Sequence, residues 1–119
     1  MTFNERYKNN ALLFKTFAFS LKIIDYSEIL QEKRKYVLAN QILKSGTSIG
    51  ANSKEAQNAE SKADFVHKLK IAMKEADEVE YWLFLCQEHK SYPDCPDLLT
   101  DLSEKLKILN KIIATTKNN

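Results

Sequence analysis

Both glycines of the chain, Gly46 and Gly50, lie four residues apart in one stretch, Gln41–Glu55, whose flanks have the composition of helices. A glycine inside a helix costs roughly 1 kcal/mol relative to alanine. Two such residues, separated by small and β-branched side chains, therefore predict a helix face that another backbone approaches closely. The alternative is a loop that interrupts the helix at Ser45–Ser48, because clustered Gly, Ser and Thr also mark turns.

Glycine and proline are scarce along the whole chain. Two residues of each among 119 leave little turn chemistry for a many-stranded fold. The share of hydrophobic residues, 44%, is ordinary for a globular chain that buries one core. We therefore expect a single all-α domain over residues 1–119.

Charge and cysteine content restrict partners and location. A formal net charge of +2 does not by itself imply nucleic-acid binding, although a local basic patch still can. Cys86 and Cys95 are too few for a disulfide framework. The sequence shows no targeting leader and no apolar run near the ~20 residues of a membrane span. We expect a cytoplasmic protein without a membrane partner.

Apolar residues recur at helical spacing in four segments. These segments cover residues 11–30, 35–59, 62–90 and 95–114. The apolar stripe of the first segment consists of Phe14, Phe17, Leu21 and Ile24, widened by Leu13, Ala18 and Ile23, and its width predicts contact with more than one neighbour. Residues 1–10 are expected to form a loosely held lead-in. Ser61, with Asp64 reaching back, is the predicted N-cap of the third segment, and Asp94 that of the fourth.

The second and third segments carry matching seams in which spacings of four and three alternate. The first seam contains Leu38, Ile42, Ser45, Ile49, Asn52, Ala56 and Ala59, and the second contains Phe65, Leu69, Ala72, Ala76, Val79, Leu83 and Cys86. In an antiparallel hairpin Ile49 meets Ala72, so that a large residue faces a small one. Asn52 on this seam needs a hydrogen-bond partner, and register fixing is its expected role. With short loops, an antiparallel up-down-up-down four-helix bundle follows.

Each of these two segments also carries a second row that one bundle seam does not require. The rows are Ala39, Leu43, Gly46, Gly50 and Ser53, and Ile71, Glu75, Glu78, Trp82 and Leu85. This surplus predicts a homo-oligomer. The candidates for close packing or for an interface are Ser45, Gly46, Gly50, Asn52, Glu75, Glu78 and Trp82.

Catalytic and metal-binding patterns are not found in the sequence. A di-iron carboxylate site needs Glu-x-x-His pairs, and no Glu is followed by His at the third position. Cys86, His89, Asp94 and Cys95 match no zinc spacing. The two glycines lack the Lys-Ser or Lys-Thr of a phosphate-binding loop. We expect no enzyme activity, no metal and no cofactor.

The densest basic run is Lys33-Arg34-Lys35, and Lys44 adds an isolated cation. These four residues are the candidate contacts for nucleic acid, although a solvated helix start is the favoured interpretation of the run for a monomer, and only repetition in a ring shifts the balance toward binding. The aromatic residues fall on packing rows, so contact with RNA or DNA is expected through the phosphate backbone, with little sequence preference.

The two central segments resemble a known family. Its first signature block is matched by residues 41–52 and Glu55-Ala56, and its second by Asp64-Phe65, Lys68-Leu69, Ile71-Ala72, Lys74-Glu75-Ala76, Glu78 and Tyr81-Trp82-Leu83. The family comprises four-helix-bundle proteins encoded in intervening sequences of 23S ribosomal RNA. The resemblance implies a homopentameric ring with no established enzyme activity. Lys44 stands where many members have arginine, which keeps the charge but loses bidentate phosphate geometry.

Relatives of this family are accessory proteins of diversity-generating retroelements, which bind nucleic acid and a reverse transcriptase. The function expected from the resemblance is therefore a non-enzymatic nucleic-acid-binding or scaffold protein, with a reverse transcriptase or another nucleic-acid enzyme as a partner. The alternative is a structural or protein-interaction module without nucleic-acid affinity.

Overall fold

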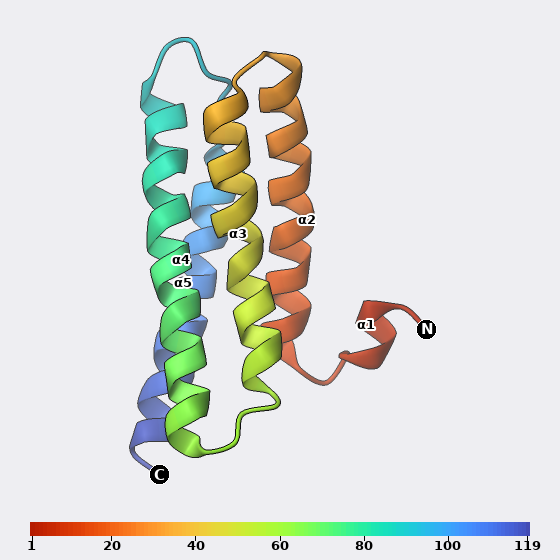
Figure 1. The fold of residues 1–119 in the computed structure, drawn as a ribbon, viewed down its shortest axis with the longest axis vertical. Helices are drawn as coiled ribbons and strands as arrows, with labels where there is room; N and C mark the ends of the chain where they lie inside the picture. The colour runs from red at the N-terminus through yellow and green to blue at the C-terminus, as the bar shows by residue number, and fades with distance from the viewer.

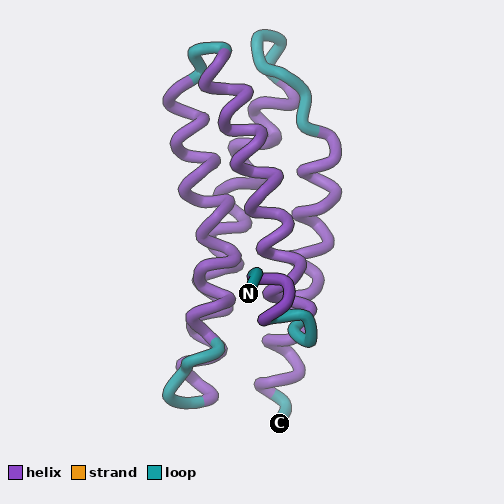
Figure 2. Tube along the Cα trace, turned by 90° about the vertical axis from the view of Figure 1, so that its right-hand side faces the viewer, coloured by secondary structure: helices purple, strands orange, loops and turns teal.

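The computed structural model describes residues 1–119, the side chain at position 96 excepted, and all of the regular structure in the described chain is helical (Figure 2). The helices are α1 (Phe3–Arg6), α2 (Ala11–Glu32), α3 (Tyr36–Ala56), α4 (Lys62–Glu88) and α5 (Pro96–Lys117). Figure 1 shows four long helices packed side by side, with α1 beside the first turns of α2. None of the described helices has the length and apolarity that crossing a membrane requires.

The chain rises along α2, descends along α3, rises along α4 and descends along α5 (Figure 1). Hydrogen bonds between α2 and α3 agree with this path. Asn10 Nδ2, just before α2, donates to Gln57 Oε1 just after α3, at 3.2 Å. Towards the other end, Ser27 Oγ donates to the Ala39 carbonyl at 3.1 Å. Helices that follow one another in the chain are therefore neighbours in the bundle.

The seams expected on α3 and α4 line the core. Their fully buried members are Ile42, Ser45, Ile49, Leu69, Ala72, Ala76, Val79, Leu83 and Cys86. Burial of each large aliphatic side chain contributes roughly 1.5–3 kcal/mol to folding. The Lys68–Glu55 ion pair, 3.4 Å between Nζ and Oε1, joins the two helices at the edge of this seam. The pairing of Ile49 with Ala72 stays a prediction.

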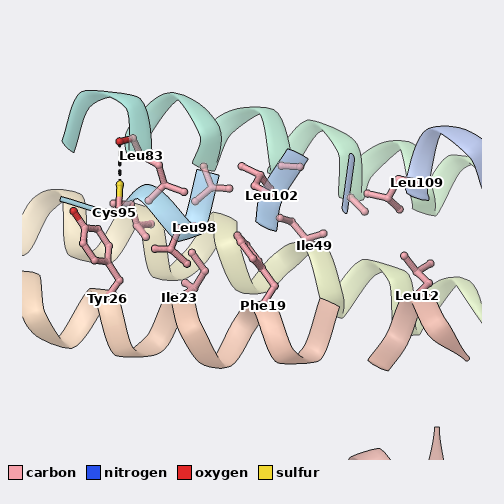
Figure 3. Close-up of a cluster of buried hydrophobic side chains, with 14 of the residues drawn as sticks. Leu12, Phe19, Ile23, Tyr26, Ile49, Leu83, Cys95, Leu98, Leu102 and Leu109 are labelled. Carbon is pink, nitrogen blue, oxygen red and sulfur yellow. Dashed lines mark hydrogen bonds between the residues drawn. The ribbon is translucent and has the colours of Figure 1, made fainter. Parts of the chain in front are cut away.

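The stripe expected on the first helix is wrong in its central row. Phe14, Leu21 and Ile24 are 43%, 50% and 37% exposed, whereas Leu13 and Ile23 from its margin are buried. The buried residues of α2 are Leu12, Leu13, Thr16, Phe19, Ile23, Tyr26, Ser27 and Leu30. Figure 3 shows Phe19 and Ile23 directed toward Leu98 and Leu102 of α5.

Two polar residues interrupt the apolar pattern of this buried face, so the sequence does not indicate it. Thr16 Oγ1 donates to the Leu12 carbonyl at 2.7 Å, and Ser27 Oγ donates to the Ala39 carbonyl at 3.1 Å. A buried hydroxyl is tolerated when it is hydrogen-bonded. Since both hydroxyls have acceptors, the face that carries them can be buried.

The glycine-bearing stretch lies inside the unbroken helix α3, which excludes the loop at Ser45–Ser48. A Cβ at Gly46 would lie 2.8 Å from Cγ1 and Cγ2 of Ile23 on α2. A Cβ at Gly50 would lie 3.4 Å from Ser20 Oγ, which is an ordinary contact. The close approach inferred from the glycines is thus made by α2 of the same chain, and this row does not remain free for a second copy.

The helix ends differ in detail from the expected bounds. α3 ends at Ala56 and α5 continues to Lys117. Ser61 caps α4 by accepting the Asp64 N–H at 3.0 Å, whereas Asp64 Oδ2 reaches one residue further back and accepts the Glu60 N–H at 3.1 Å. The prediction of Asp94 as the N-cap of α5 is wrong. Its carboxylate accepts the N–H of Cys95, at 2.8 Å, and Cys95 occupies the cap position.

The expected lead-in contains a short helix, α1. Thr2 and Glu5 form a capping box, in which the Glu5 N–H donates to Thr2 Oγ1 at 3.1 Å and the Thr2 N–H to Glu5 Oε2 at 3.4 Å. The Phe3 ring stacks on Phe17 of α2, with centroids 4.1 Å apart. No residue of α1 is fully buried, so this ring stacking is its main tertiary contact.

Candidate nucleic-acid and assembly surfaces

The basic run forms the tight turn between α2 and α3. Arg34 has φ 63, in the left-handed region. The Arg34 N–H donates to the Gln31 carbonyl at 2.9 Å and the Lys35 N–H to the Leu30 carbonyl at 2.8 Å. This is the Schellman motif, in which glycine usually takes the left-handed position. An arginine there costs roughly 1 kcal/mol, and the turn directs the Lys33 and Arg34 side chains into solvent.

The connection between α4 and α5 joins this turn at the same end of the bundle (Figure 1). Lys35 Nζ lies 3.4 Å from Ser91 Oγ and 5.0 Å from the centre of the Tyr92 ring. His89 lies edge-on to Tyr92, with ring centroids 5.5 Å apart, and Lys90 is exposed. The connection between α4 and α5 therefore adds a lysine and a histidine to the three predicted cations.

Sequence reasoning did not place His89 and Lys90 beside the turn, because more than fifty residues separate them from it. The only available signal was topological, since the first and third connections of an up-down-up-down bundle meet at one end. Acidic residues are interleaved with the cations, namely Glu32, Glu88, Asp94 and Asp97. The four lysine and arginine charges at this end are therefore matched by four acidic ones.

The structure does not bring Lys44 to the turn. It is exposed on α3, nine residues beyond Lys35 and thus about 14 Å further along the helix axis. No described side chain forms an ion pair with it. Lys44 is a separate cation on the side of the bundle.

The close-packing candidates divide by burial. Ser45 and Gly46 are buried, Gly50, Asn52, Glu75 and Trp82 are half-buried, and Glu78 is exposed. Asn52 Nδ2 donates to the Ser48 carbonyl of its own helix at 2.8 Å, so this bond does not fix the register between helices. The Trp82 indole N–H is buried without an acceptor among the described residues.

Two outward apolar faces are largely exposed in the chain, although the Phe3 ring stacks on Phe17 of the first one. On α2 the face consists of Phe14, Phe17, Leu21 and Ile24, whose spacings of three, four and three are typical of a helix–helix seam; we call it the outer α2 face. On α4, Tyr81 is 61% and Leu85 39% exposed. These surfaces, rather than the glycine row, are available for another chain.

The two cysteines lie beside Tyr26 in the core. The Tyr26 hydroxyl donates to the Pro93 carbonyl at 2.6 Å, and Cys95 Sγ donates to the Leu83 carbonyl at 3.4 Å (Figure 3). Burial raises the pKa of the Cys86 thiol, and it raises the pKa of Cys95 to about 11. Both thiols are therefore protonated at neutral pH, and neither supplies a thiolate nucleophile.

His67 is exposed on α4, and His89 Nδ1 accepts the Ser91 N–H at 3.2 Å. Within the described side chains, no three His, Cys, Asp or Glu residues come together as a metal site. The geometry thus offers cations at the turn between α2 and α3 and apolar faces along the sides of the bundle.

The protein is thus all-helical with four long helices, and its two signature blocks lie on α3 and α4. The chain belongs to the 23S rRNA-intervening sequence protein family, whose model matches residues 8–115. The resemblance drawn from the two signature blocks is confirmed.

A solved structure supports the same assignment. It is a protein with unknown function from the S23 ribosomal protein family of Bacteroides thetaiotaomicron VPI-5482. The two chains are 40% identical and superpose with a TM-score of 0.78, over 87% of this chain and 98% of the other. No curated protein matches the chain.

Proposed function

We propose that this chain is a non-enzymatic nucleic-acid-binding or scaffold protein that contacts RNA or DNA through the phosphate backbone. The observation that carries the proposal is the cluster of cations on the two connections at one end of the bundle. Arg34 stands there in a conformation that glycine would adopt at lower cost. Backbone strain that persists at a charged residue is a reason to assign that residue a binding role.

Lys33, Arg34 and Lys35 belong to a turn, which cannot enter a groove as a recognition helix does. Contact with phosphates does not require side chains to enter a groove, and the affinity of such binding falls steeply as the salt concentration rises. Binding with little sequence preference follows, with Lys44 as a further contact along α3.

The test replaces Lys33, Arg34 and Lys35 together by glutamine and compares affinities for unrelated RNA and DNA oligomers at two salt concentrations. The variant should bind more weakly, and each lost phosphate contact should reduce the salt slope by about 0.7–0.9. Arg6→Gln/Lys8→Gln/Lys54→Gln removes the same charge elsewhere and serves as the control. Tight binding to one sequence with a shallow salt slope would refute backbone contact.

We further propose that the working unit is a homopentameric ring of antiparallel bundles. Two different apolar faces, on α2 and on α4, favour a head-to-tail contact, which closes into a ring when the rotation allows. Five copies repeat the cations of the turn on one rim, and phosphate affinity grows with the number of neutralised contacts. The ring would then act in the cytoplasm as a scaffold for a reverse transcriptase or another nucleic-acid enzyme.

A protein-interaction module without nucleic-acid affinity is the second candidate. The outer α2 face favours it, because Phe14, Leu21 and Ile24 together expose a continuous apolar strip that a partner helix can cover. Absence of binding to any oligomer at low salt would decide for this candidate.

A further inference from the structure

The end of the bundle opposite the basic turn carries a second group of cations. There the first turns of α4 meet the last turns of α5 (Figure 1). Lys62 and Lys70 of α4 and Lys117 of α5 are all exposed. None of these three ammonium groups has an acidic partner among the described side chains. We call this group the lysine face.

Lys70 of α4 is close enough to Lys117 of α5 to affect its titration. This proximity lowers the pKa of Lys117, because a neighbouring cation disfavours its charged form. The dipole at the end of α5 accounts for a lysine at position 117, in the last turn. It does not account for Lys70, which lies inside α4.

Two of the acids at this end are held by other groups. Glu55 pairs with Lys68 at 3.4 Å, and Asp64 Oδ2 accepts the Glu60 N–H at 3.1 Å. Glu60 itself is exposed in the connection between α3 and α4. None of these carboxylates forms an ion pair with Lys70 or Lys117, so the repulsion between the two lysines is not offset by a neighbouring acid.

The surface between these lysines is hollowed. Lys62, Ala63, Val66 and Lys117 border a shallow, largely apolar cleft of about 490 Å³. Lys62 of α4 and Lys117 of α5 each place one cation at the border of this cleft. Such a cleft places two positive charges around a group as small as one phosphodiester.

We propose that the lysine face is a second contact for the phosphate backbone of nucleic acid, opposite the basic turn. The proposal rests on the proposed function and extends it to an elongated ligand. α3 alone spans 21 residues, or about 32 Å. At 3.4 Å per base pair, a duplex must exceed about 10 base pairs to reach both ends of one bundle.

The test uses Lys62→Gln/Lys70→Gln/Lys117→Gln and measures its affinity for a 24-base-pair RNA duplex and a DNA duplex of the same length by fluorescence anisotropy. We expect at least a tenfold loss relative to the control Arg6→Gln/Lys8→Gln/Lys54→Gln. The triple arginine variant at the same three positions should restore binding, since it keeps the charge. All six positions are exposed, and circular dichroism confirms that each variant is folded.

The outcomes separate the two proposals. Wild-type binding that the glutamine variant retains at the level of the control overturns the lysine face alone. A loss in this variant, with none in the Lys33/Arg34/Lys35 variant, supports the lysine face and removes the turn from the contacts. Failure of the wild type to bind either duplex overturns both. Binding to anionic vesicles instead of duplexes would assign the lysine face to a membrane surface and overturn the inference.

Discussion

Ile23 of α2 packs directly over Gly46 of α3, so closely that a Cβ on the glycine would lie 2.8 Å from two of its carbons. Ile23 is fully buried, and its β-branched side chain has little freedom to turn away. The contact allows the two backbones to approach at the middle of the bundle. It also explains why a helix accepts a residue that costs it propensity.

Gly46→Ala is therefore expected to destabilise the chain by ~1–3 kcal/mol through overpacking, although alanine is the better helix former. Gly50→Ala is the matched comparison, since its new methyl would make only an ordinary contact at 3.4 Å. It should be neutral or stabilising by up to ~1 kcal/mol. Urea unfolding measures both free energies. Equal losses in the two variants would show that the Ile23 contact does not distinguish the two glycines.

Arg34→Gly should raise the free energy of unfolding by ~0.5–1 kcal/mol, because glycine adopts the left-handed conformation without steric cost. The gain is net of the extra freedom that glycine gives the unfolded chain. Lys33→Gly is the control, since Lys33 has φ −87 and gains nothing from the substitution. Denaturant titrations that show no gain, or an equal gain for Lys33→Gly, would contradict the strain assigned to Arg34.

Leu21→Glu should prevent the proposed assembly and leave the fold of each chain intact. Leu21 is 50% exposed on the outer α2 face, so a carboxylate there remains in water in the free chain and is buried in an apolar contact in the assembly. Light scattering at micromolar concentration measures the mass, and circular dichroism the helix content. Asn40→Glu, on the exposed side of α3, is the control. An unchanged mass for Leu21→Glu would place the interface elsewhere, and a wild type of 13.8 kDa would exclude assembly.

Stability should fall as the pH rises from about 9 through 11, because the Cys95 thiol is buried in its neutral form. The folded pKa is about 11 against an ordinary value of 9.0, so in this range the unfolded chain binds fewer protons than the folded one. The contribution is complete below pH 9 and is lost on passing the folded pKa. Thermal unfolding of the wild type and of Cys95→Ser across this range checks the prediction. The serine variant should show a shallower alkaline decline, and an identical decline would assign it to other groups.

The sequence by itself determined the pairing faces of α3 and α4. Each helix carries one long row with alternating spacings of four and three, and the chain places Leu83 and Ile42 of these rows in the core. The two glycines also indicated, from the sequence alone, that another backbone approaches α3 closely. Their effect on the backbone is local, so it can be read without the tertiary structure. The family signature lies on these two helices, and it is therefore read equally well from the sequence.

Only the tertiary structure decided which face of α2 is buried. The helix has two apolar faces, and the packing of the neighbouring helices determines which of them is covered. α3 and α5 cover the face with Ile23, where Thr16 and Ser27 find carbonyl acceptors, and the stripe with Leu21 stays in solvent. The tertiary structure likewise decided that Lys70 and Lys117 are neighbours, because they are 47 positions apart in the sequence. Coulomb repulsion depends on distance in space, and the bundle sets that distance when it brings the start of α4 to the end of α5.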